Sequence, residues 1–190
     1  MIDLPLHLDV YLATLMQLYG VWIYVIVFIV IFCETGLVFT PFLPGDSLLF
    51  ILGTFAATGN LDLYLILGLA TVAAILGDSI NYHIGKMIGP KIFHSESAKI
   101  LNKKHLTATQ EFYKRYGSKT IVIARFMPII RTFAPFVAGI GRMKYQEFFL
   151  WNVVGAIAWV FSFVIAGYFF GNIPLVKENL SLFILGIIFL

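Results

Sequence analysis

The sequence has few charges for its length, and this scarcity excludes several classes of protein. Charged residues make up 12% of the 190 positions and hydrophobic residues 60%, whereas soluble proteins carry about 25% charged residues. A soluble domain of this size could not bury that much apolar surface. The composition therefore excludes a soluble enzyme, a nucleic-acid-binding protein and a disordered linker, and it indicates an integral membrane protein.

The chain also lacks the residues and motifs of common active sites. Its single cysteine, Cys33, excludes an intramolecular disulfide and a cysteine-based zinc site. The four histidines have no metal-binding spacing, so we expect neither a metal nor a cofactor. The sequence contains no GxxxxGK[ST], GxSxG or HExxH motif, which argues against ATP as a driving force and against the common hydrolases. We therefore expect that the protein is not an enzyme.

Long apolar segments predict the helices that cross the membrane. A first helix is expected over residues 10–33 and a second over 62–84. The third, 146–171, largely coincides with a run of 29 uncharged residues, 148–176, and is the clearest of them. Residues 180–190 are apolar but too short to span, so we expect them to be the start of a last helix that is truncated in this sequence.

Residues 86–119 separate the two halves and hold eight basic residues against two acidic ones. The positive-inside rule makes this segment a cytoplasmic loop. A solvated basic face is the main interpretation, and binding to anionic lipid headgroups is the alternative.

Two further apolar segments are interrupted near their middle. Residues 34–58 contain Pro41, Pro44 and Gly45, and residues 117–141 contain Pro128 and Pro135. Proline disrupts a continuing helix, and arms of about 10 residues suit re-entrant hairpins better than full crossings. Broken backbone at membrane depth must be covered by protein or line a wet cavity. We therefore expect both hairpins to line one internal cavity.

Each interrupted segment precedes a spanning helix, and the two helices would run in opposite directions. Paired, Pro/Gly-interrupted segments in two inverted halves are typical of a transporter's central site. The predicted fold is an all-α integral membrane protein, a single domain over residues 1–190. It is an inverted repeat of two re-entrant helical hairpins, each followed by a transmembrane helix.

Four charged residues fall inside the interrupted segments: Glu34, Asp46, Arg125 and Arg131. An unpaired charge at mid-membrane costs roughly 2.5–3.5 kcal/mol, so these residues must pair, face water or hold a ligand. One interpretation is two structural salt bridges that brace the hairpins. The other is a phosphate site, because guanidinium groups match phosphate oxygens bidentately and a broken helix offers free backbone N–H groups.

In the phosphate interpretation Arg125 and Arg131 bind the phosphate, while Glu34 and Asp46 take up and release protons. Burial and a nearby arginine act in opposite directions on a carboxylate, which suits it to proton exchange. Asp46 could also cap the helix that follows it. Asp78, Asn81 and Tyr82 share one helical face and are auxiliary candidates, with a hydrated or arginine-paired structural role favoured for Asp78.

Two segments, FCETG…TPFLPGDSLL (residues 32–49) and ARFMPIIRTFAPFVAG (residues 124–139), resemble the DedA family, whose domain is also called VTT or SNARE-associated. The resemblance covers nearly the whole chain. It implies a bacterial inner-membrane protein with two opposed re-entrant hairpins. It also implies transport of undecaprenyl phosphate or phospholipids, often coupled to protons. The family's acidic pair matches Glu34 and Asp46, and its arginine pair matches Arg125 and Arg131.

We therefore expect a proton-coupled transporter, or flippase, for a phosphate-headgroup lipid, most simply undecaprenyl phosphate. The expected partners are that lipid (a polyprenyl phosphate or a phospholipid) and protons, with no nucleic acid and with a homo-oligomer left open. Three alternatives remain: an intramembrane lipid-phosphate enzyme, a structural factor for membrane-protein assembly, and a proton-coupled carrier of small ions.

Overall fold

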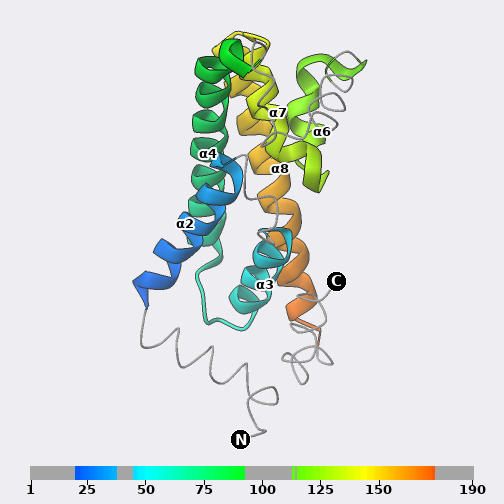
Figure 1. The fold of residues 1–190 in the computed structure, drawn as a ribbon. Helices are drawn as coiled ribbons and strands as arrows, with labels where there is room; N and C mark the ends of the chain where they lie inside the picture. The colour runs from blue at the N-terminus through cyan, green and yellow to red at the C-terminus, as the bar shows by residue number, and fades with distance from the viewer. Residues whose placement is uncertain (1–19, 38–44, 93–112, 114, 174–190) are drawn as a thin grey trace, which may run out of the picture. The chain divides into compact units, whose positions relative to one another are not determined.

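The computed structural model describes residues 20–37, 45–92, 113 and 115–173 of the chain. Within these ranges the regular structure is entirely helical (Figure 1), so the predicted all-α class is confirmed. The predicted start of the first helix, Pro41 and Pro44, most of the basic loop and residues 180–190 lie outside the described ranges. In chain order, the helices are α2 (Val21–Gly36), α3 (Gly45–Ala57), α4 (Leu63–Ile92), η1 (Gly117–Lys119), α6 (Thr120–Ala124), α7 (Pro128–Ile140) and α8 (Tyr145–Gly171).

Two of these helices are long and apolar enough to cross a membrane. They are 63–87 within α4, with 25 residues, and α8, with 27. At about 1.5 Å per residue either one exceeds the 30 Å hydrocarbon core of a bilayer. The sequence predicts these helices at 62–84 and 146–171. Because α4 continues to Ile92, the first residues of the expected cytoplasmic loop are helical. The charged residues indicate where the chain leaves the lipid, but they do not end the helix, because lysine is a good helix former.

The second interrupted segment breaks at one proline and continues through the other. Residues 125–127 separate α6 from α7; the last of them, Met127, has extended backbone, and Pro128 is the first residue of α7. Proline favours an extended residue before it and suits the first helical position. Pro135, which we expected to be a break, lies inside α7. It removes only the N–H that would bond to the carbonyl of Arg131, and the packed helix around it tolerates that loss.

The chain divides into two compact units, and α2, α4 and α8 contribute residues to both of them. Unit 1 comprises residues 1–29, 44–70 and 160–190. Within it α3 lies along the C-terminal part of α8 (Figure 1). A Cβ at Gly53 would overlap the carbonyl oxygen of Val164, and one at Gly167 would overlap that of Phe50. Glycine is therefore required for this close approach of two helix backbones.

Unit 2 comprises residues 30–43 and 71–159, and it repeats this packing with other helices. Here α7 lies against α4, where a Cβ at Gly139 would overlap the carbonyl oxygen of Tyr82. A Cβ at Gly85 would likewise overlap the carbonyl oxygen of Phe136. The helix after each interruption thus packs through glycine on the later part of a long helix, α3 on α8 and α7 on α4.

Candidate functional site

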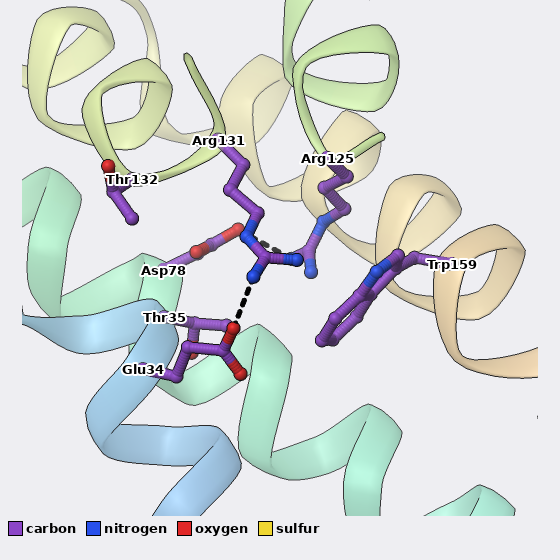
Figure 2. A pocket seen from close by; sticks show the side chains of 7 residues that line it. All are labelled: Glu34, Thr35, Asp78, Arg125, Arg131, Thr132 and Trp159. Carbon is purple, nitrogen blue, oxygen red and sulfur yellow. Dashed lines mark hydrogen bonds and ion pairs between the residues drawn. The ribbon is translucent and has the colours of Figure 1, made fainter. Parts of the chain in front are cut away.

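A small pocket in unit 2 collects most of the charged residues that the sequence analysis singled out. Its free volume is about 10 Å³, which is about the space that one water molecule needs. Figure 2 shows the two arginine side chains reaching into it from one side, toward each other, with the glutamate facing them. The lining residues come from α2, α4, the α6–α7 connection, α7 and α8; they are Glu34, Thr35, Asp78, Arg125, Arg131, Thr132 and Trp159.

The first ion pair joins Glu34, near the C-terminal end of α2, to Arg131 in the first turn of α7. Glu34 is 1% exposed. Beside this pair, the buried side-chain amide of Asn81 on α4 donates to two carbonyl oxygens. These belong to Thr35, at 3.2 Å, and Thr132, at 2.9 Å. Since each is the neighbour of one member of the pair, Asn81 holds both segments against α4.

The second ion pair joins Arg125 to Asp78 of α4, with 2.5 Å between Nη2 and Oδ2. The same nitrogen donates to Oδ1 of Asn152 on α8, at 2.6 Å. Asn152 in turn donates to the carbonyl oxygen of Ile75, at 3.0 Å. A buried charge is tolerated only when it is paired and hydrogen-bonded, and Arg125, at 4% exposed, meets both conditions.

Both arginines also lie over the indole ring of Trp159 on α8. The guanidinium carbon is 5.5 Å from a ring centroid for Arg131 and 5.9 Å for Arg125. These distances are within the range of a cation–π attraction. One aromatic side chain therefore contacts both cations of the pocket.

Nε of Arg125 and Oδ1 of Asn81 are buried near the pocket and have no hydrogen-bond partner within the described part of the chain. An unsatisfied buried polar atom costs about 1–3 kcal/mol. Gly155 leaves room for the arginine, since a Cβ there would lie 3.1 Å from Nε. The guanidinium group of Arg125 thus retains one unused N–H donor, on the side that faces Gly155 of α8.

The structure brings together three of the four predicted charges and replaces the fourth. Glu34, Arg125 and Arg131 line the pocket, together with Asp78. Asp46 belongs to unit 1, as the second residue of α3, and is not among the lining residues. Asp78, for which a hydrated or arginine-paired role was favoured, is paired with Arg125. Since α3 begins at Gly45, Asp46 stands within its first turn, where a negative charge is favoured by the helix dipole.

The two other auxiliary candidates have different surroundings. Asn81 donates hydrogen bonds to two backbone carbonyl oxygens beside the pocket, as described above. Tyr82 points elsewhere: its ring stacks on Phe148, with centroids 4.5 Å apart, and its hydroxyl donates to the carbonyl oxygen of Met143. Tyr82 is therefore part of the helix packing and not of the pocket.

We expected free backbone N–H groups at the break, and for four of these groups the expectation is wrong. The N–H groups of Arg125, Phe126, Met127 and Arg131 all donate to carbonyl oxygens three or four residues earlier. The connection between α6 and α7 is a tight turn, so its donors are satisfied locally. Recognition of an anion would therefore depend on the side chains.

Asn152 and Trp159 belong to the site although they were not predicted from the sequence. Asn152 was detectable, because an amide in a long uncharged span is costly and needs a partner. Gly155 and Trp159 follow it at positions i+3 and i+7, on the same helical face. Trp159 had no such signal, since a tryptophan in an apolar helix is ordinary.

The pocket combines two cations with two carboxylates, so its formal charge is zero when all four are ionised. A phosphate monoester carries about −1.5 to −2 charges at pH 7. Such a ligand would bind favourably only if the arginines left the carboxylates, or if the carboxylates became neutral. Within the described ranges no group of three or more His, Cys, Asp or Glu side chains could hold a metal ion.

Comparison with known proteins finds relatives of this chain among bacterial proteins, several of them named membrane proteins. Residues 43–169 match the family model of the VTT domain. The chain is 54% identical to protein DedA of Escherichia coli K12 over 190 residues, covering 99% of this chain and 87% of that protein. It is 41% identical to membrane protein Rv0364 of Mycobacterium tuberculosis H37Rv, covering 86% and 72%. Inner membrane protein YghB of Escherichia coli K12 is 34% identical, covering 83% and 72%. No solved structure matches the chain.

Proposed function

The chain belongs to the DedA family of membrane proteins, and on that premise we propose that it carries a phosphate-headgroup lipid, undecaprenyl phosphate, across the membrane. One observation carries the proposal: Arg125 and Arg131 converge on a single buried pocket, each paired with a carboxylate. Two guanidinium groups on one side of a pocket are suited to the oxygens of a phosphate. The lipid tail would remain in the bilayer.

The small size of the pocket supports a closed resting state. About 10 Å³ cannot hold a phosphate group, so the ion pairs must separate before the headgroup enters. Glu34 and Asp78 then take up protons, which keeps the loaded pocket close to neutral. Proton uptake in one state and release in the other couples lipid movement to the proton gradient. A proton-coupling role for Asp46, from outside the pocket, stays a prediction.

The inverted repeat and the orientation belong to the same proposal. The reciprocal glycine contacts, α3 on α8 and α7 on α4, fit two halves built alike. We place the protein in the bacterial inner membrane with residues 86–119 in the cytoplasm, on the basis of the basic residues in that segment. The headgroup would then move from the outer to the cytoplasmic leaflet.

The experiment is leaflet-specific transport of labelled undecaprenyl phosphate in proteoliposomes, with and without a pH gradient. Arg131→Lys keeps the charge but loses the planar fork, so we expect transport to fall at least tenfold, the equivalent of about 1.4 kcal/mol. Lys119→Arg, an exposed conservative change outside the pocket, is the matched control. Wild-type transport by the Arg131→Lys protein would refute the phosphate role.

A structural role for the two ion pairs is the second candidate, and the closed geometry favours it. Exchanging the partners, as Glu34→Arg with Arg131→Glu, separates the two functions. If the ion pair is a structural brace, the exchanged protein keeps its stability and activity. If the pair belongs to a phosphate site, the exchanged protein still folds but loses transport, because the cation has moved to position 34.

A further inference from the structure

Trp159 is placed unlike the other tryptophans of the chain. It is 1% exposed and lines the charged pocket. Trp22 is 65% exposed, and Trp151 packs against an apolar cluster that includes Phe148. A large aromatic side chain buried beside two ion pairs needs a physical reason, because an aliphatic residue could fill the same space.

The two guanidinium groups provide that reason. They share a pocket with room for about one water molecule and repel each other, and the carboxylates offset this repulsion only while the ion pairs are closed. When the pairs open, another group must hold the two flexible side chains in position. Without such a group, both arginines lose the geometry that a phosphate requires.

An indole ring suits this task. Its face attracts cations through the ring quadrupole, and both guanidinium carbons already lie within 6 Å of Trp159 (Figure 2). The ring carries no net charge, so it does not compete with a phosphate for the arginines. It also cannot be neutralised by a proton, so its attraction persists when the carboxylates are protonated.

The same face of α8 supports one of the arginines at two more points. Asn152 accepts a hydrogen bond from Arg125, and the missing side chain of Gly155 leaves the space for its Cδ and Nε atoms. Gly155 and Trp159 follow Asn152 at three and seven positions, so all three lie on one helical face. We propose that Trp159 is a positioning residue that keeps Arg125 and Arg131 side by side while Glu34 and Asp78 release them. The phosphate part of this role rests on the proposed function, but the hold on the arginines does not.

The test varies the ring quadrupole without changing the ring's shape. Fluorinated tryptophans weaken the cation–π attraction stepwise and can be incorporated in a tryptophan auxotroph. The full chain carries Trp22→Phe and Trp151→Phe, so that only Trp159 is labelled, together with Glu34→Gln and Asp78→Asn to imitate the released state. We expect the unfolding temperature to fall by roughly 2–4 °C from tryptophan to the most fluorinated analogue. If the doubly neutralised protein does not fold, Glu34→Gln alone replaces it.

The matched control retains Trp151 alone, through Trp22→Phe and Trp159→Phe, and should show no dependence on fluorination. A flat response at Trp159, or an equal response at Trp151, would overturn the inference. A second readout on the carboxylate-bearing protein is calorimetric binding of decyl phosphate, expected to weaken about tenfold across the series. If decyl phosphate does not bind the unmodified protein but the stability response persists, the proposed function fails and the positioning role stands.

Discussion

Neutralising Asp78 should destabilise the protein far more than neutralising Asp46. Asp78→Asn leaves the cation of Arg125 buried at 4% exposure, with Asn152 as the remaining acceptor at 2.6 Å. Breaking a buried ion pair by removing one partner costs about 3–5 kcal/mol. The surviving hydrogen bond keeps the expected cost near the lower end, about 3 kcal/mol. Total stabilities are about 5–15 kcal/mol, so the loss is a large share.

The assay is thermal unfolding in detergent. Unfolding is monitored through the reaction of the single thiol, that of Cys33, which is partly buried in α2. A loss of about 3 kcal/mol corresponds to a decrease of roughly 6–12 °C in a chain of this length. Asp46→Asn is the stability control. It stands in the first turn of α3 and is only partly buried, so removing its charge costs about 0.3–1 kcal/mol.

A double variant shows whether the cost comes from the pair or from the position. Asp78→Asn with Arg125→Gln removes both charges, and we expect it to recover at least half of the lost stability, because an uncompensated charge no longer remains. The reasoning is refuted if Asp78→Asn unfolds within about 1 kcal/mol of Asp46→Asn, or if the double variant is no more stable than Asp78→Asn.

The remaining predictions concern packing and a hydrogen bond, and the same unfolding assay measures them. Gly139→Ala should destabilise the protein by about 1–3 kcal/mol, because its Cβ would overlap the carbonyl oxygen of Tyr82. The control is Gly68→Ala, where a Cβ would have nothing within 4 Å, and it should be neutral or stabilise by up to about 1 kcal/mol. Equal effects of the two substitutions would contradict the packing described. Tyr113→Phe should cost about 1 kcal/mol, because the hydroxyl donates to the carbonyl oxygen of Ala134 at 3.0 Å. Burial raises the pKa of Tyr113, so this difference should be constant below pH 10, the ordinary pKa of tyrosine being about 10, and should shrink only above it; a change between pH 6 and 9 would contradict the buried, protonated phenol.

Much of the architecture could be predicted because it follows from local properties of the chain. A long apolar run in a membrane forms a helix, since a lipid-exposed backbone must satisfy its own hydrogen bonds. The two predicted runs contain the two helices that are long enough to cross. The break before Pro128 likewise follows from the missing N–H and the restricted backbone of one residue. Pro135 shows the limit of this reasoning: the same residue lies inside α7, because tertiary packing can hold a helix together across one missing hydrogen bond.

The sequence by itself determined that Glu34, Arg125 and Arg131 must find partners, because a lone charge in an apolar segment is too costly whatever the fold. Only the tertiary structure decided which partners they have: Asp78 pairs with Arg125, and Trp159 lies beside both guanidinium groups. These contacts join residues 28 to 47 positions apart, and no local pattern records which distant side chains meet. The cost of burying a charge can be estimated for each residue from the sequence, but which side chains pair depends on how the helices pack.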